Sequence, residues 1–205
     1  MQIDVLIVTD HNTIQGARNA KSLARGNPPL VITAAEYQSE KGDIIGLFLK
    51  EEIHSRDSKE IIQHIHEQGG LVVLPHPYKG HTLDEELLAA CDLIESYNAR
   101  CSESDNGRAQ QLAQDLKRPF LAGADAHCSL EIGAALNEYL AEPPSNESEL
   151  REHLLHSSLR ITTERVSPLC GPYSQLIKSV KTKDPKLFLY QAKRLALVFA
   201  RGTVR

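Results

Sequence analysis

Six residues spread over the chain carry side chains that can hold a divalent metal ion, and each is expected at or beside the end of a strand. Neutral imidazoles and carboxylates hold zinc, manganese or iron when one coordination position must stay open for water. Their spacing fits no compact zinc-finger motif, so they can share a site only if the fold brings distant strand ends together. The six predicted ligands are His11, Glu36, Asp43, His76, Asp125 and His127.

Each of these positions also has an ordinary structural explanation. Asp10 could cap the following helix, and His11 could lie in a simple turn. His76 could be a core histidine, Asp125 a turn former and Glu36 a solvated strand end. Each alternative stays open for its own residue. The same polar ending recurs on independent strands, however, and that repetition favours one shared site.

Two basic residues follow predicted strand ends, where a cation could meet a metal-bound anion. These are Lys79 and Arg100, the second of which comes soon after Asn98 at the end of an apolar run. We predict that Lys79, Arg100 and Asn98 contact the substrate, and solvated surface cations are the alternative. His54 and His81 lie in neighbouring loops and could reach a substrate without being metal ligands.

The elements that must position these side chains alternate between strand and helix. Apolar runs rich in β-branched residues and bounded by glycine, proline or polar residues predict strands. Apolar residues at helical spacing predict helices between them. Such alternation favours a β/α barrel, whose strands end at one face. The expected strands are 3–8, 30–35, 43–49, 71–74, 92–97, 119–123 and 159–163, and the expected helices are 14–25, 57–68, 83–91, 106–116, 145–156 and 183–201.

Composition places the chain among ordinary globular proteins. With 205 residues, 41% of them hydrophobic, it is expected to form one domain with an appendage. A net charge of -4 with interspersed signs argues against a stable nucleic-acid complex. The chain shows neither a membrane-length apolar run nor a secretory signal pattern, so we expect no membrane association and a cytoplasmic location. Four cysteines without C-x-x-C spacing indicate reduced thiols.

Five segments together carry a resemblance to a known family: residues 4–13, Glu36, His76-Pro77, residues 94–100 and residues 123–127. They resemble the PHP family, the polymerase and histidinol phosphatase domain of metal-dependent phosphoesterases. Residues 42–48 resemble a branch of short stand-alone members. The resemblance covers residues 1–165 and leaves residues 166–205 as a C-terminal helical extension. It implies a distorted seven-stranded, TIM-like β/α barrel with two or three metals at the C-terminal strand ends.

The resemblance also implies roles for single residues. Glu36 would bridge two metals, His76 would bind the second metal, and His11 and His127 would bind a third. Asp125 would be a bridging or first-metal ligand, whereas Asp43 stands where many members have a histidine. With zinc, manganese or iron bound, the metals would lower the pKa of a water and hold the phosphate oxygens. We predict that the catalytic residues are Asp125, His127 and His76.

The largest departure from the family pattern comes before Ile3, where members have a strand ending in His-x-His and then a helix. The comparison implies fewer metals here, and a first strand that is open to self-association or is covered by the segment after Val166. We therefore predict hydrolysis of a small phosphomonoester, nucleotide or short oligonucleotide by a metal-bound hydroxide. The alternative is a catalytically impaired metal-binding or interaction remnant, and histidinol phosphate is not separable from other substrates on fold alone.

Overall fold

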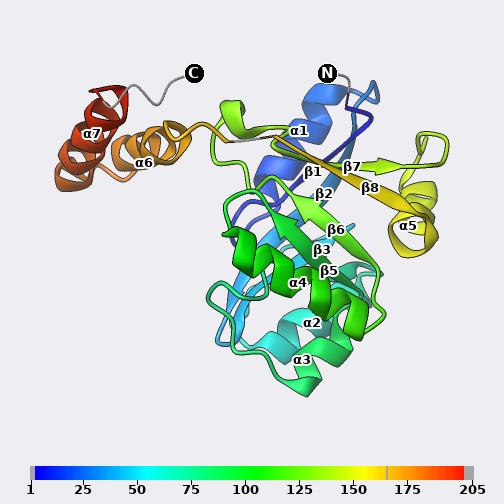
Figure 1. Cartoon of the computed structure of the whole chain (residues 1–205). Helices are drawn as coiled ribbons and strands as arrows, with labels where there is room; N and C mark the ends of the chain where they lie inside the picture. The colour runs from blue at the N-terminus through cyan, green and yellow to red at the C-terminus, as the bar shows by residue number, and fades with distance from the viewer. Residues whose placement is uncertain (1–2, 165, 201–205) are drawn as a thin grey trace.

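The computed structural model describes residues 3–164 and 166–200 and shows a mixed α/β fold built on a curled, open sheet (Figure 1). The six strands lie in the order in which they follow along the chain. Strand β3 is antiparallel to β2 and β4, and the other neighbouring pairs are parallel. The strands are β1 (Val5–Val8), β2 (Leu30–Ser39), β3 (Gly42–Leu47), β4 (Leu71–Leu74), β5 (Leu93–Asn98) and β6 (Phe120–Gly123).

Helices cover the outer face of this sheet because their apolar residues pack on it at helical spacing. Ile61 and Ile65 of α2 and Leu87 of α3 belong to one buried cluster, which the half-buried Leu112 of α4 joins. Aspartate, serine or asparagine caps the start of α2, α3, α4 and α5, where its side chain accepts free backbone N–H groups. The helices are α1 (Gln15–Ala24), α2 (Ser58–Glu67), α3 (Glu85–Ala90), α4 (Glu103–Asp115) and α5 (Glu147–His156).

The inner face of the sheet has apolar residues at one end and polar residues at the other. Alternate residues of a strand point to the same face, so Ile32 and Ala34 of β2 lead directly to Glu36. The other strands continue apolar rows in the same way, and α5 closes the apolar end with Leu150 and Leu154. The rows run from Ile7 to His11, from Leu47 through Ile45 to Asp43, from Leu93 to Glu95, and from Leu121 through Gly123 to Asp125.

A separate two-stranded antiparallel sheet follows β6. It consists of β7 (Ala135–Tyr139) and β8 (Leu159–Thr163). The side-chain amide of Asn137 joins this sheet to β6, because it accepts the Ala122 N–H and donates to the Ala122 carbonyl, both at 2.8 Å. One side chain thus supplies the pair of hydrogen bonds that a neighbouring strand would supply.

The expected seven-stranded TIM-like barrel is not confirmed. The segment predicted to close it, β8, pairs with β7 and is not part of the six-stranded sheet. Strand β7 itself was not predicted, since its sequence mixes small, polar and aromatic residues without a clear apolar period. Among the described strands, β1 pairs on one side only, with β2, so the predicted self-association through this edge stays a prediction.

The C-terminal part forms two helices that pack on each other, α6 (Cys170–Lys181) and α7 (Pro185–Ala200). Figure 1 shows this hairpin projecting from the body on the side away from α5. The hairpin adds no strand to β1, contrary to one of the expectations for the segment after Val166. In the described part of the chain, no helix combines the length and the apolar character needed to span a membrane.

Candidate metal centre

His11 and Glu36 come together because pairing between β1 and β2 continues beyond the end of β1. The two residues form an isolated parallel bridge, in which Asn12 N–H donates to the Glu36 carbonyl at 2.8 Å. The backbone N–H of Glu36 in turn donates to the Asp10 carbonyl at 3.1 Å. As a result, the His11 Nδ1 atom lies 3.6 Å from Glu36 Oε2. The Glu36 side chain is largely buried, whereas that of His11 is half exposed.

Asp43 joins this pair through the β2–β3 hairpin. Glu36 was expected to end its strand, but β2 continues to Ser39 because Tyr37 to Ser39 pair with Ile44 to Gly42. Since β3 runs back antiparallel, the start of β3 lies beside the later part of β2. One ligand atom each from His11, Glu36 and Asp43 can therefore lie within 4.8 Å of the others.

His76 completes this side of the site from the loop after β4. Its Nε2 atom lies 3.1 Å from Glu36 Oε1 and 4.0 Å from Asp43 Oδ2. Burial lowers the pKa of His76, but the hydrogen bond to Glu36 and the charges of Glu95 and Glu36 outweigh burial, so the net pKa is raised. The other ring nitrogen, Nδ1, is buried and has no hydrogen-bond partner among the described residues.

Asp125 and His127 form the opposite side of the site, after β6. The His127 Nδ1 atom lies 3.2 Å from Asp125 Oδ1 and 2.9 Å from the Asp125 carbonyl. Because both neighbours are acceptors, we assign the proton to Nδ1, and Nε2 makes no hydrogen bond to any residue that the structure describes. The hydrogen bond that His127 donates to Asp125 raises the pKa of His127. Burial raises the pKa of Asp125, but the hydrogen bond and charge of His127 outweigh it and lower that pKa overall.

The two sides face each other across the same end of the sheet. The His11 and His127 ring centroids are 6.3 Å apart. Of the six predicted ligands, the structure brings four close together: His11, Glu36, Asp43 and His76. It brings Asp125 and His127 into contact with each other, and the ring of His127 next to that of His11.

Glu95 is a buried carboxylate of this site that the sequence analysis did not select. Its Oε2 atom accepts the backbone N–H of His76 at 2.6 Å and the Asn98 side-chain N–H at 3.0 Å. Burial raises the pKa of Glu95 to about 7, although these hydrogen bonds act in the opposite direction. A Cβ atom on Gly123 would lie 1.9 Å from Glu95 Oε1, so any larger residue there would force the Glu95 carboxylate to move. The sequence feature that could have identified Glu95 is its carboxylate in the predicted strand 92–97, because a buried carboxylate is costly unless it has partners.

His81 is a second site residue that was left outside the predicted ligand set. Its Nε2 atom lies 2.8 Å from the Asp43 carbonyl, and its ring centroid is 5.4 Å from that of His76. The ring lies directly over Gly42, where a Cβ atom would be 2.4 Å away. Burial lowers the pKa of His81. We interpret His81 as a residue that holds the backbone of Asp43 in place. The sequence around His81, which follows Lys79-Gly80, gives no indication of this contact.

The three predicted substrate contacts differ in their surroundings. The Lys79 side chain is about half exposed, and its Nζ atom lies 3.9 Å from Asp125 Oδ2 at the rim of the site. Asn98 is buried and uses its side chain on Glu95 and on the backbone N–H of Arg100. The Arg100 guanidinium donates twice to Glu131 Oε1, at 3.0 and 2.8 Å. Lys79 therefore remains accessible to a ligand, whereas Asn98 and Arg100 are engaged within the protein.

The donor set fits divalent cations. Carboxylates from neighbouring strands face imidazoles, and such oxygen and nitrogen donors suit zinc, manganese and iron. Asn12, His76 and Asp125 have positive φ values, of 57°, 28° and 48°. Asparagine, aspartate and histidine adopt this conformation more readily than most residues, and Arg25, Phe48, Lys117 and Lys183 share it away from the site.

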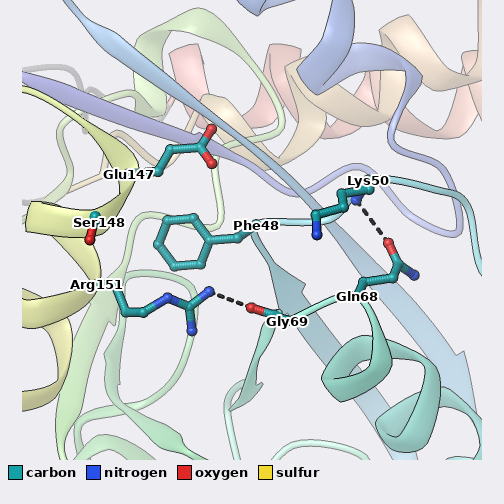
Figure 2. A pocket seen from close by; sticks show the side chains of 7 residues that line it. All are labelled: Phe48, Lys50, Gln68, Gly69, Glu147, Ser148 and Arg151. Atoms are coloured by element: carbon teal, nitrogen blue, oxygen red, sulfur yellow. Dashed lines mark hydrogen bonds between the residues drawn. The ribbon is translucent and has the colours of Figure 1, made fainter.

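A hollow elsewhere on the molecule holds none of the predicted residues. Figure 2 shows it between the end of β3 and the start of α5, lined by Phe48, Lys50 and Arg151 among others. Its volume is about 270 Å³. The Arg151 guanidinium lies over the Phe48 ring and donates to the Gly69 carbonyl, so it is tied to the protein. The candidate metal centre is therefore defined by converging side chains at the polar end of the sheet, away from this hollow.

Comparisons with known proteins agree with this architecture. Residues 103–158 match the family described as PHP-associated. The uncharacterized protein MJ1587 of Methanocaldococcus jannaschii is 46% identical over 77 residues, which cover 37% of this chain and 45% of that protein. The uncharacterized protein MJ0417 of the same organism is 31% identical over 147 residues, covering 66% of this chain and 62% of that protein. The chain thus spans less than two thirds of either relative.

A solved structure from Bacteroides vulgatus shares the fold. It is a two-domain protein containing a predicted PHP-like metal-dependent phosphoesterase, and it superposes with a TM-score of 0.66 at 15% sequence identity. The match covers 78% of this chain and 56% of that one. At this identity the likeness concerns the fold alone. The PHP-associated segment and the fold shared with a PHP-like protein support a relationship of this chain to the PHP-domain family.

Proposed function

We propose that this chain is a metal-dependent phosphoesterase that acts on a small phosphomonoester, a nucleotide or a short oligonucleotide. The observation that carries the proposal is the convergence of His11, Glu36 and Asp43, whose ligand atoms lie within 4.8 Å of one another, with His76 beside them. The family relationship supports the same chemistry, because the similar Bacteroides vulgatus protein contains a predicted metal-dependent phosphoesterase.

The proposed metal ligands divide into two groups. His11, Glu36, Asp43 and His76 form one group, in which Glu36 offers one oxygen toward each histidine. Asp125 and His127 form the other group across the site. Bound divalent cations would lower the pKa of a water and neutralise charge on the phosphate oxygens.

The protein's own residues would orient the substrate and hold protons. Lys79 presents an exposed cation beside Asp125, where it can neutralise a phosphate oxygen. Asp125 fixes the proton of His127 on Nδ1 and thereby directs Nε2 into the site. Asn98 and Arg100 are proposed to act indirectly. Asn98 positions Glu95, and Arg100 holds Glu131, which accepts the backbone N–H of His127 at 2.7 Å.

The proposal is tested by measuring phosphate release with and without added zinc, manganese or iron. The substrates are a chromogenic phosphomonoester, nucleoside monophosphates and a short oligonucleotide. Asp125→Asn keeps the shape of the side chain but removes its charge, so we expect hydrolysis to fall by about 10- to 100-fold. Glu85→Gln, an exposed change on α3, is the matched control and should leave the rate unchanged.

Two outcomes would contradict the phosphoesterase proposal. Hydrolysis that persists in a chelator, or that Asp125→Asn retains in full, would place the activity outside this centre. Metal binding by the intact chain without hydrolysis of any substrate would favour the alternative, a metal-binding domain that lacks catalytic activity. Comparing metal content with turnover on the same samples separates these cases.

A further inference from the structure

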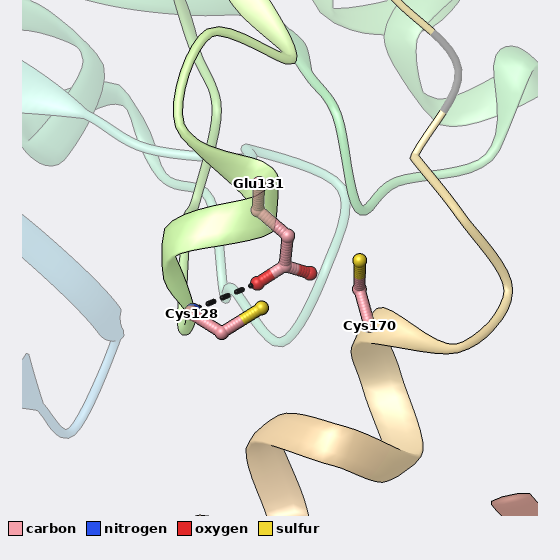
Figure 3. Close-up of side chains that lie close together, drawn as sticks. All are labelled: Cys128, Glu131 and Cys170. Atoms are coloured by element: carbon pink, nitrogen blue, oxygen red, sulfur yellow. Dashed lines mark hydrogen bonds between the residues drawn. The ribbon is translucent and has the colours of Figure 1, made fainter.

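A second cluster of reactive side chains lies behind the candidate metal centre, where the loop after β6 meets the start of α6. Cys128, Glu131 and Cys170 can place one sulfur or oxygen atom each within 4.8 Å of the others. Figure 3 shows the two sulfur atoms turned toward the gap between the loop and the helix, next to the Glu131 carboxylate.

The Glu131 carboxylate of this cluster already accepts hydrogen bonds on both of its oxygens. Its Oε1 atom accepts two N–H groups of Arg100, and its Oε2 atom accepts the backbone N–H groups of His127 and Cys128. A carboxylate has about four acceptor positions, so little remains for a cation. The Arg100 guanidinium also places a positive charge beside the cluster. Two thiols without a free carboxylate make an incomplete zinc site, since structural zinc takes four ligands.

The sulfur pair itself is well suited to another reaction. We propose that Cys128 and Cys170 form a reversible disulfide that ties α6 to the loop of the candidate metal centre. The two residues come from segments that are far apart in the sequence, and Cys170 is fully buried while Cys128 is partly exposed. This difference in exposure sets the order of events, because an oxidant in solution can reach only the sulfur of Cys128 directly.

The reaction is an exchange with a low-molecular-weight disulfide. The Cys128 thiolate attacks one sulfur of that disulfide, forms a mixed disulfide and releases one thiol. The Cys170 thiolate then attacks the Cys128 sulfur and releases the second thiol. In total, two cysteine thiols lose two hydrogen atoms and two electrons to the small disulfide, which is reduced to two thiols.

The product would connect the C-terminal hairpin covalently to the body. At present that connection includes one hydrogen bond, from Arg100 Nη2 to Ser174 Oγ of α6 at 3.2 Å. A disulfide between residues 128 and 170 would restrict the unfolded chain. We therefore expect the oxidised protein to unfold at a higher temperature than the reduced protein, and dithiothreitol to reverse the shift.

The test is peptide mapping of the full chain after incubation with glutathione disulfide. Trypsin places the four cysteines in separate peptides, residues 80–100, 101–108, 118–151 and 166–178, so each pairing has a distinct mass. We expect the intact protein to lose two hydrogen atoms and peptide 118–151 to be linked to peptide 166–178. A Cys91→Ala, Cys101→Ser double variant should give the same cross-link. Cys170→Ser should instead retain glutathione on Cys128.

Three results would overturn the proposal. The first is the absence of the cross-linked peptide from the wild-type digest, a readout that does not depend on any variant folding. The second is a cross-link that involves Cys101 in place of Cys170. The third is a cobalt-thiolate absorption band that appears on titration with cobalt(II) and disappears in Cys170→Ser, because that band would identify the pair as metal ligands.

Discussion

The side chains of the candidate metal centre depend on neighbours that are themselves buried and charged. Glu36 is 8% exposed and faces two histidines, and Glu95 is 5% exposed and supports the backbone of His76. Buried carboxylates are costly unless they are paired. At the residue scale, the two glutamates are therefore expected to respond differently to the same substitution, since Glu36 faces the cluster and Glu95 lies behind it.

Glu36→Gln should lower metal content while the protein stays folded. The amide keeps the shape of the side chain but loses the charge that offsets two cations, and such losses reduce metal affinity by about 10- to 100-fold. Metal analysis after dialysis, with circular dichroism on the same sample, measures both effects. Glu85→Gln on the exposed surface of α3 is the control. An unchanged metal stoichiometry in Glu36→Gln would exclude the bridging role.

Glu95→Gln should flatten the pH dependence of stability in metal-free protein. The pKa of Glu95 is raised from 4.5 to about 7, so the folded state binds this proton more tightly than the unfolded state does. Stability from this group is therefore fully present below about pH 4.5 and is lost as the pH rises to about 7. The loss amounts to roughly 3 kcal/mol.

Urea unfolding at about pH 5 and about pH 8 measures this loss for both proteins. Wild type should lose more free energy of unfolding than Glu95→Gln over this interval. The raised pKa of His76 contributes in the same direction and depends in part on the Glu95 charge, so the difference between the two proteins measures Glu95 together with its coupling to His76. Parallel pH profiles would show that Glu95 is ionised in the folded protein throughout the interval.

At the scale of elements, the join between the two sheets depends on one amide. Asn137 makes both of its hydrogen bonds to the backbone of Ala122 in β6. Because Ala122 is buried, Asn137→Ala would leave its N–H and carbonyl without partners. The expected cost is about 1–3 kcal/mol per unsatisfied group, and the change should appear as a lower urea midpoint with a similar slope.

Asn19→Ala is the matched control for this substitution. Asn19 lies on the exposed face of α1, where its side chain accepts one N–H from Gln15. An exposed position of this kind should change the free energy of unfolding by less than about 0.5 kcal/mol. If both variants had the same midpoint, the Asn137 amide would not join the sheets in solution.

At the scale of the whole molecule, Arg100 links three parts of the chain. It follows β5, pairs with the buried Glu131 before β7, and donates to Ser174 of α6. Arg100→Met would leave a carboxylate with 1% exposure without its cation. Removing one partner of a buried pair typically costs about 3–5 kcal/mol. The free energy of unfolding from urea titration measures this cost.

Arg160→Met provides the comparison at the surface. The Arg160 guanidinium is 4.0 Å from Glu138, and its side chain is 71% exposed. Exposed ion pairs contribute only about 0–1 kcal/mol. A similar small effect for Arg100→Met would contradict its role in holding the molecule together and would return it to the group of substrate contacts predicted from the sequence.

The sequence alone determined much of the local structure, because local structure depends on nearby residues. The apolar run between Gly70 and Pro75 predicted β4 with its observed bounds, the predicted strand 159–163 matches β8, and helical spacing predicted α2 close to its observed start and end. Polar residues after those runs marked six candidate ligands. Helix α6 lies within the predicted C-terminal helical extension, but its own bounds were not predicted, because Gly171 and Pro172 at its start lower the helical signal although proline is tolerated in a first turn.

Only the tertiary structure decided which candidate residues share a site and which support it. The β2–β3 hairpin brings Asp43 at the start of a strand beside Glu36, and no spacing in the sequence specifies that antiparallel register. Likewise, the Arg100 guanidinium donates to Glu131, and the Asn137 side chain hydrogen-bonds to the backbone of β6 where a neighbouring strand would otherwise do so. These contacts join residues up to dozens of positions apart. Their geometry depends on how the layers pack, whereas hydrophobic periodicity reports only which face of an element is buried.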